Sequence, residues 1–121
     1  MTVDPTGEDL KRFLDEDDGG PVVMLNLLRF KEDGGRATYE RYGEAIQPFL
    51  AEVGAELVYL GDCSTSLVAP DGHEWDLLLL ARYPSRGAFA AMVANPEYQK
   101  ITHLRTEALS AAVLQATLPR L

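Results

Sequence analysis

The first long apolar stretch of the chain, VVMLNLLRF at residues 22–30, is hydrophobic at both alternating positions. A second stretch, DLLLLARY at residues 76–83, has the same character. In a lone antiparallel sheet with one face in water, apolar and polar residues alternate along each strand. The two stretches therefore predict strands, placed at about 21–30 and 74–83, whose faces are both covered in the folded protein.

Helical periodicity accounts for two segments in the first half of the chain. Thr6 and Asp9 have the spacing of a capping box, which predicts a short helix over about 6–15. Apolar residues recur every three or four positions over 38–53, which predicts a second helix that ends at the following glycine. Because Pro48 lies inside this helix, we expect a kink or a break there.

A hairpin is predicted to follow the second helix. Residues 56–69 have strand character, and Gly61 within them predicts a bulge. The sequence PDGH at 70–73 is typical of a turn, and it connects this strand to the strand at 74–83. The two strands are therefore expected to form an antiparallel pair.

The last third of the chain is predicted to be helical before it ends in a strand. Ser85 is the expected N-cap of a helix that the sequence ANPEY interrupts and that then continues to about residue 108. The last strand is placed at 111–118. After the short N-terminal helix the order is β-α-β-β-α-β, which predicts an α+β ferredoxin-like sandwich: a four-stranded antiparallel sheet with both helices on one face. We expect a single domain over 1–121, with its core at 21–118.

One face of such a sheet lacks a cover, because both helices lie on the other face. A second copy of the same sheet is the simplest cover, since it is apolar at the same positions. The sequence therefore predicts a homodimer in which two sheets pack face to face.

Composition and charge exclude several classes of protein. The 121 residues are 46% hydrophobic and 25% charged, which is ordinary for a globular protein, and 19 acidic against 11 basic residues give a formal net charge of −8. A nucleic acid or an anionic membrane would need a basic surface, so neither partner is expected. The N-terminal sequence lacks the features of a signal peptide and no apolar stretch is long enough to span a membrane, which predicts a cytoplasmic location.

Recognisable motifs for metal, phosphate and nucleophile chemistry are missing from the sequence. Cys63 is the single cysteine, so an intrachain disulfide is excluded. His73 and His103 do not combine with it in the spacing of a metal site. The glycines form no phosphate-binding loop, and no serine stands in a nucleophile elbow. We therefore expect neither a metal nor a cofactor.

Asn26 is a polar residue in the middle of the first apolar strand. A buried amide costs on the order of 1–3 kcal/mol unless it is hydrogen-bonded. Two interpretations stay open: Asn26 is satisfied within the core, or it lines a pocket. The first strand of a ferredoxin-like sheet lies between the third and the fourth. If the alternation coincides, Asn26 would meet polar groups of both neighbours, namely Asp76, Arg82, Gln115 and Thr117.

Four aromatic side chains are candidates for the wall of a pocket. Tyr42 and Tyr98 lie on the apolar faces of their helices, where each either packs in the core or turns its hydroxyl into a cavity. Tyr39 lies about a turn before Tyr42, which places it at the rim. Trp75, at the start of a strand, would cap the core or wall the pocket.

Three polar residues are candidates for catalysis. Arg105 falls near the inward face of the last helix and suits an anionic or enolic oxygen, with a surface ion pair as the alternative. His103 is the best general base by its unperturbed pKa near 6.5, but it projects away from that face, so we expect it to be exposed. Asp76 would cap the strand that follows it or act as a base.

The sequence resembles the family called domain of unknown function 1330, of the dimeric α+β barrel superfamily. The segments VVMLNLLRFK, YERYGEAIQPFLAEVGAELVYLG, EWDLLLLARYPSRGAFAAMVANPEYQ and LRTEAL carry the resemblance over residues 21–118. It implies a dimer in which each subunit holds a small aromatic or lactone-like ligand between sheet and helices. Members of the superfamily include monooxygenases without a prosthetic group, haem-degrading enzymes, isomerases and cyclases, so it implies no single reaction. For haem, His103 is the one modest axial-ligand candidate.

These observations lead to two hypotheses of different classes. In the first, the protein is a cofactor-independent monooxygenase or isomerase for an enolisable or phenolic substrate. Asn26 and Arg105 would then hold oxygen atoms as these gain negative charge, His103 or Asp76 would move a proton, and the aromatic residues would wall the pocket. In the second, the protein is a non-catalytic ligand-binding or structural homodimer. A buried pocket with perturbed titratable groups would favour the first.

Overall fold

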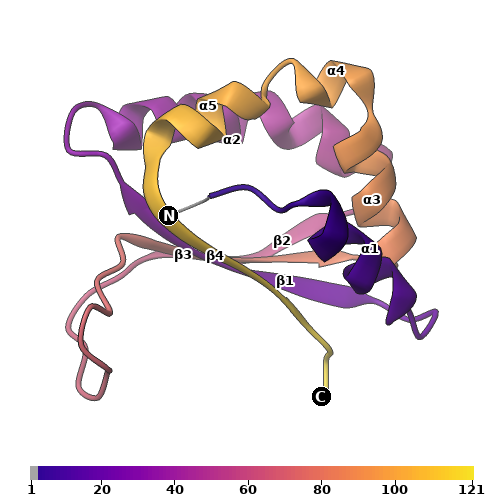
Figure 1. Ribbon diagram of the computed structural model, residues 1–121, viewed down its shortest axis with the longest axis horizontal. Coiled ribbons are helices and arrows are strands. Elements are labelled where there is room, and N and C mark those ends of the chain that lie inside the picture. Colours follow the sequence, from indigo (N-terminus) through magenta and orange to yellow (C-terminus); the bar gives the residue numbers. More distant parts are fainter. Residues whose placement is uncertain (1–2) are drawn as a thin grey trace.

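A computed structural model describes residues 3–121 of the chain as an antiparallel sheet with helices on one side (Figure 1). The elements in chain order are α1 (Gly7–Asp15), β1 (Val22–Phe30), α2 (Gly35–Glu52), β2 (Glu56–Asp62), β3 (Leu77–Tyr83), α3 (Arg86–Ala94), α4 (Pro96–Gln99), α5 (Thr102–Ala108) and β4 (Leu109–Thr117). After α1, this order confirms the predicted β-α-β-β-α-β arrangement, with the second helical region divided into three short helices.

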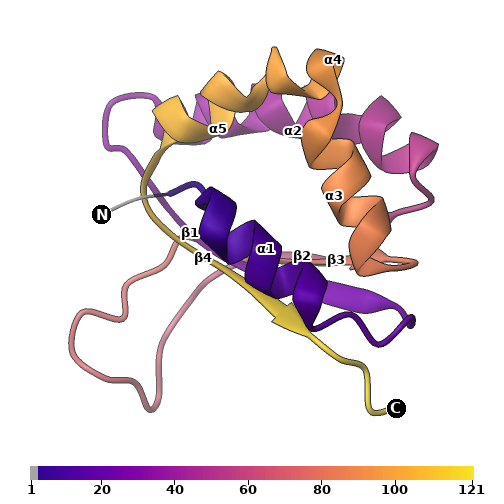
Figure 2. The same ribbon diagram turned by 45° about the vertical axis from the view of Figure 1, so that its right-hand side comes forward.

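The sheet has the strand order β2-β3-β1-β4, so β1 lies between β3 and β4 as predicted. All its pairings are antiparallel, and Asn26 lies opposite Leu79 of β3 and Leu114 of β4. The helices lie above the sheet and its lower face is bare (Figures 1 and 2). No helix within residues 3–121 is long and apolar enough to cross a membrane.

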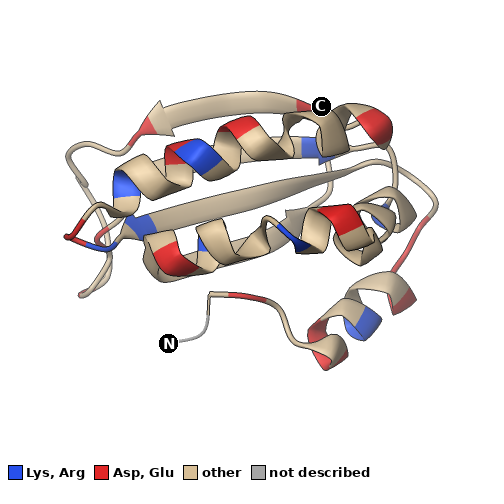
Figure 3. Ribbon diagram, turned by 90° about the horizontal axis from the view of Figure 1, so that it is seen from above, with Lys and Arg blue, Asp and Glu red and all other residues tan. Residues whose placement is uncertain are grey.

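The N-terminal helix α1 forms as the capping signal predicts. The Thr6 side chain accepts a hydrogen bond from the Asp9 amide at 3.1 Å, and the Asp9 carboxylate accepts one from the Thr6 amide at 3.2 Å. Phe13 packs edge-on against Phe89 of α3, with ring centroids 5.4 Å apart. Helix α1 therefore lies beside α3. Acidic residues lie within α1 and in the segment that follows it (Figure 3).

Helix α2 is longer than predicted. It begins at Gly35 rather than at residue 38, because Gly34 adopts a positive φ of 77° and turns the chain directly into the helix. Gly35 also allows a close approach, since a Cβ there would lie 2.5 Å from the carbonyl oxygen of Ala108. The helix continues through Pro48, so the predicted break into two helices is wrong. Pro48 itself is exposed, and the apolar residues around it stay packed on the core. Gly54, with φ of 74°, follows the helix end as predicted.

The hairpin differs most from its prediction. Strand β2 ends at Asp62 and β3 begins at Leu77, so residues 63–76 form a long loop in place of the predicted strand ends. The register irregularity of β2 lies between Leu57 and Tyr59, not at Gly61. Gly61 instead makes room for the Tyr59 ring, with which a Cβ at this position would collide. The loop is tied to β1 where it meets β3, because the Asp76 amide donates to the Leu28 carbonyl at 2.8 Å, and its two ends are joined by the Cys63 amide, which donates to the Asp76 carbonyl at 2.9 Å.

The caps of the later helices agree with the sequence. Ser85 accepts a hydrogen bond from the Ala88 amide at 3.1 Å and begins α3, and Asn95 accepts one from the Glu97 amide at 2.9 Å and begins α4, with Pro96 in its first turn. Strand β4 begins at Leu109, two residues earlier than predicted, because α5 ends directly at Ala108.

Candidate functional site

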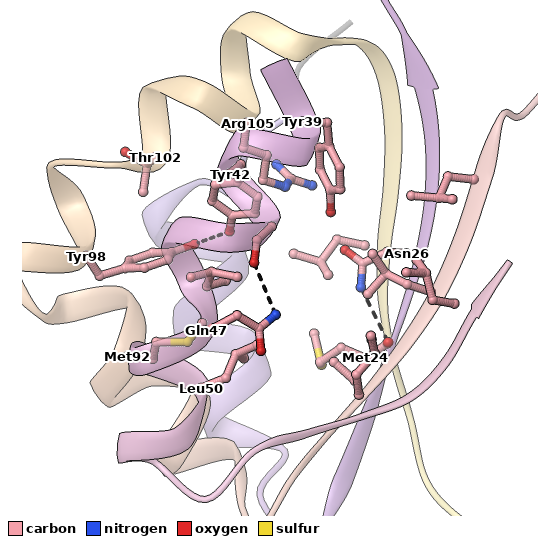
Figure 4. A pocket seen from close by; sticks show the side chains of 18 of the residues that line it. Met24, Asn26, Tyr39, Tyr42, Gln47, Leu50, Met92, Tyr98, Thr102 and Arg105 are labelled. Carbon is pink, nitrogen blue, oxygen red and sulfur yellow. Dashed lines mark hydrogen bonds between the residues drawn. The ribbon is translucent and has the colours of Figure 1, made fainter. Parts of the chain in front are cut away.

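A cavity of about 1040 Å³ lies between the sheet and the helices α2 to α5. Its floor includes alternate residues of β1 and β3, and its roof consists of side chains from α2, α3, α4 and α5 (Figure 4). Most of the lining is apolar, with Met24, Leu50 and Met92 as examples. The buried polar groups within it are few, and they come from segments far apart in the sequence; the carboxylates of the lining, Asp4, Glu40, Glu44 and Asp62, belong to exposed residues.

Arg105 brings a buried positive charge to the cavity wall. The residue is 7% exposed, and its guanidinium lies beside Tyr39 and Tyr42 (Figure 4). One terminal nitrogen, NH1, donates to the Val3 carbonyl and to the Asp4 carboxylate, the latter at 3.1 Å. The other, NH2, is buried and has no hydrogen-bond partner within residues 3–121. A buried guanidinium with a free donor is costly, so a further acceptor is expected to meet it.

Tyr42 of α2 and Tyr98 of α4 form a buried hydroxyl pair in the same wall. Their oxygen atoms are 2.7 Å apart, so one hydroxyl donates to the other and one proton remains free to bind a third group. Burial raises the pKa of Tyr42 and also that of Tyr98 above the ordinary value of 10. Both phenols are therefore neutral near pH 7 and act as hydrogen-bond groups rather than as bases.

Tyr39 belongs to this wall as well, and its predicted place at the rim was wrong. The residue is 9% exposed, and its ring centroid lies 5.5 Å from that of Tyr42 and 5.6 Å from that of Phe30. Burial raises the pKa of Tyr39 to about 12. The three-residue spacing from Tyr42 was the available signal, because it places both rings on one helix face.

Asn26 lies in the floor of the cavity. Its Nδ2 donates to the Met24 carbonyl at 3.4 Å, which is a long hydrogen bond, and the residue is 8% exposed. Figure 4 shows the other end of the amide turned toward the cavity. The buried polar groups of the cavity are thus one guanidinium, one amide and four neutral phenols, the fourth being that of Tyr83, whose pKa burial also raises.

The predicted convergence of strand polar groups on Asn26 was wrong. Register pairs Gln115 and Thr117 with Leu25 and Val23, which face the opposite side of the sheet. Arg82 lies opposite Val23 as well. Alternation fixes this result once the pairing is known, and the pairing depends on tertiary structure.

Trp75 and Asp76 lie outside the cavity wall, at the base of the loop 63–76. The Asp76 carboxylate accepts a hydrogen bond from the Phe30 amide at 2.8 Å, which fits the capping alternative for this residue. The Trp75 nitrogen donates to His73 at 3.3 Å, and the Arg29 guanidinium lies 5.3 Å from the centre of the tryptophan ring. These contacts hold the loop to the end of β1.

His103 is exposed on α5, as its helical angle predicts, and it does not line the cavity. Among residues 3–121, the His, Cys, Asp and Glu side chains form no group of three that is placed to hold a metal ion. Burial and the nearby Asp76 and Asp62 carboxylates raise the pKa of the Cys63 thiol, which disfavours its thiolate.

The N-terminal segment completes the site without any signal in the sequence. Asp4, Pro5 and Leu10 line the cavity, and Thr106 of α5 donates to the Asp4 carboxylate at 2.9 Å. These contacts span about a hundred residues of sequence, so local patterns could not reveal them.

Comparison with known proteins places this architecture in a family. The family described as Domain of unknown function (DUF1330) matches residues 33–116. A protein of unknown function from Rhodopseudomonas palustris is 31% identical, with a TM-score of 0.89 over 97% of this chain and 95% of that one. No curated protein matches the chain significantly.

More distant solved structures share the fold alone. A protein from Bacteroides fragilis, described as dimeric, ferredoxin-like and of unknown function, is 14% identical, with a TM-score of 0.57 over 81% of this chain and 95% of that one. A protein from Bacteroides thetaiotaomicron, proposed to be an antibiotic biosynthesis monooxygenase, is 16% identical, with a TM-score of 0.61 over 84% of this chain and 91% of that one.

Proposed function

The chain belongs to the domain of unknown function 1330 family, and on that premise we propose that it is a homodimer that binds a small aromatic or lactone-like ligand in the cavity of each subunit, and that this ligand carries an anionic oxygen. The observation that carries this proposal is the buried NH2 of Arg105, which has no partner within residues 3–121. An anionic oxygen of a ligand would satisfy it with a charge-assisted hydrogen bond.

The remainder of the cavity supports the same kind of ligand. Apolar side chains such as Leu79, Phe89 and Leu114 would contact a carbon skeleton, while the few polar groups would fix its orientation. Tyr42 and Tyr98 offer one free hydroxyl proton near Arg105, and Asn26 offers a polar group from the floor. The volume of about 1040 Å³ accommodates a molecule of one or two rings.

The bare face of the sheet supports the homodimer. Its side chains include Val23, Leu25 and Leu27 of β1 and Leu78 and Leu80 of β3, all only partly covered in the isolated chain. A second copy would bury them, at about 25 cal/mol for each Å² removed from water. The solved Bacteroides fragilis protein of the same fold is described as dimeric.

Calorimetric titration with 2-naphthoate and with its uncharged analogue 2-naphthamide tests the binding proposal. The wild-type protein is expected to bind the carboxylate, and Arg105→Gln to bind it at least about tenfold more weakly, because a charge-assisted hydrogen bond contributes roughly 1.5–3 kcal/mol. Retained binding of 2-naphthamide by the variant would show that the cavity is intact.

Arg36→Gln is the matched control for this titration. Arg36 also lines the cavity, but its side chain is half exposed at the rim and pairs with Asp62 at 2.9 Å. Its removal changes the net charge equally and should leave the affinity for 2-naphthoate within about twofold. An equal loss in both variants, or no binding by the wild type, would overturn the proposal.

Oxygenation of a phenol is the second candidate, favoured by a buried cation beside neutral phenols. Arg105 would stabilise the phenolate form of a substrate such as 1-naphthol, whose proton leaves to water. The phenolate then gives electrons to O2, one oxygen atom replaces the hydrogen at the para carbon, and the other leaves as water; 1-naphthol and O2 thus give 1,4-naphthoquinone and water. Isomerisation would need a base beside the substrate: both predicted bases, Asp76 and His103, lie outside the cavity wall, and the carboxylates that line it, Asp4, Glu40, Glu44 and Asp62, belong to exposed residues.

An oxygen electrode combined with chromatography tests this candidate. We expect one O2 consumed for each quinone formed, with the rate lost in Arg105→Gln and kept in Arg36→Gln. Binding of 1-naphthol without O2 uptake would instead support the non-catalytic ligand-binding alternative.

A further inference from the structure

Both buried arginines of the described chain hold the N-terminal segment in place. Arg86, 5% exposed, donates to the Phe13 carbonyl at 3.0 Å and lies 4.8 Å from the centre of the Phe13 ring, which anchors α1. Arg105 holds the segment before α1, through the Val3 carbonyl and the Asp4 carboxylate. We call residues Val3–Pro5 the strap.

The strap crosses between the helix layer and the sheet, on the side where α5 and β4 meet (Figures 1 and 2). Asp4 and Pro5 line the large cavity, and together with Val3 they also line a second cavity of about 440 Å³ under α1. The strap therefore lies at the boundary between the two spaces, together with Leu10, Met24, Phe89 and Leu114, which also line both.

Asp4 engages only part of the guanidinium. Its Oδ1 contacts NH1 at 3.1 Å, its Oδ2 is turned to the Thr106 hydroxyl at 2.9 Å, and NH2 stays without a partner within residues 3–121. A carboxylate that is not tethered to the protein chain would bind both terminal nitrogens of the guanidinium at once, which is the stronger geometry. The Asp4 side chain is 49% exposed, so water rehydrates it readily once it leaves.

We propose that Asp4 is an internal occupant of the anion site on Arg105, and that a ligand carboxylate replaces it and releases the strap. This inference rests on the proposed function, because it concerns the same cavity and the same guanidinium. Exchange of one carboxylate for another keeps Arg105 neutralised throughout, so no uncompensated charge is buried at any stage. It also gives Arg105 its missing second contact.

A carboxylate suits the site better than a more highly charged anion. Arg105 is the one cationic residue in the inner wall within residues 3–121, because Arg36, the other arginine of the lining, lies at the rim and is paired with Asp62. One planar guanidinium with one positive charge matches the geometry and the charge of a monocarboxylate. Helix α1 would stay in place during the exchange, since its anchors are Arg86 and the capping box at Thr6.

Asp4→Asn tests the exchange by calorimetry with the same two probes. The variant should bind 2-naphthoate up to about fivefold more tightly than the wild type, because a half-exposed ion pair that the ligand must break contributes at most about 1 kcal/mol. Binding of 2-naphthamide should not change. Glu8→Gln is the matched control: it removes an equal charge from an exposed position of α1 and should leave both affinities unchanged.

Hydrogen exchange on the wild-type protein supplies a second measurement. On addition of 2-naphthoate, the amides of Val3 and Asp4 should exchange faster, while the Thr6 amide, which belongs to the capping box, and those of α1 keep their rate. If the wild type binds 2-naphthoate but Asp4→Asn binds it equally or more weakly, or if the strap becomes more protected, the exchange is wrong and the proposed function survives. If neither the wild type nor Asp4→Asn binds 2-naphthoate, both the exchange and the proposed function are wrong.

Discussion

The two faces of β1 differ in a way that their hydrophobicity conceals. Val22, Met24 and Leu28 are buried under the helices, and Asn26 lies among them. On the opposite face Leu25 and Leu27 are only partly covered, because no helix lies over this face of the sheet (Figure 1). The face under the helices therefore buries its polar residue Asn26, whereas the polar residues that neighbouring strands add to the open face, Arg82, Gln115 and Thr117, are not buried.

This contrast separates two uses of apolar residues. Under the helices they surround a cavity whose buried polar groups are a guanidinium, an amide and four phenols, each of which costs free energy when it is buried without a full set of partners. On the open face they provide shape and area, and the polar residues there, Arg82, Gln115 and Thr117, lie on the neighbouring strands and, within residues 3–121, enclose no cavity wall with them. The first arrangement suits a small molecule, and the second suits a flat surface such as another sheet.

Leu27→Asp is expected to have the largest effect on this comparison. Two copies of the substitution would place desolvated carboxylates in the proposed sheet-to-sheet interface, so the dimer dissociation constant should rise at least about a hundredfold. Sedimentation at micromolar concentration would measure it. Val58→Asp is the control, because Val58 is 54% exposed on the edge strand β2. A wild-type monomer, or dissociation in both variants, would show that the open face is not the interface.

Asn26→Leu is expected to have a smaller effect, and of a different kind. Replacing an amide that makes one long hydrogen bond should raise the free energy of unfolding by about 1 kcal/mol, while the affinity for 2-naphthoate falls by a similar amount. The dimer should be unaffected, although Asn26 and Leu27 are adjacent in the chain. Denaturant unfolding and calorimetry together measure both changes. Higher stability with unchanged affinity would mean that Asn26 is only a core residue.

Much of the fold was predictable because its signals are local. The capping box at Thr6, the Ser85 and Asn95 caps and the positive φ of Gly54 each depend on a few neighbouring residues. The strand ends of the hairpin were not predictable. Their position depends on Asp76, whose carboxylate and amide bind β1 some 46 residues away in sequence.

The candidate site was predictable only in its parts. Helical spacing placed Tyr42, Tyr98 and Arg105 on inward faces, and the structure brings all three to one wall. Trp75, Asp76 and His103 had suitable chemistry, but they lie outside the wall. Residue type and spacing give the direction of a side chain from its own element, whereas the distance between two elements comes from packing.

The sequence by itself determined the order of the elements, the central place of β1 and the apolar character of both faces of the sheet. These follow from hydrophobic periodicity and from the fixed geometry of helices and strands. Only the tertiary structure decided which parity of β1 faces the helices, that Arg105 keeps a buried nitrogen without a partner in the described chain, and that Asp4 reaches it from the other end of the chain. Register and long-range contacts depend on the whole fold at once, so no local pattern encodes them.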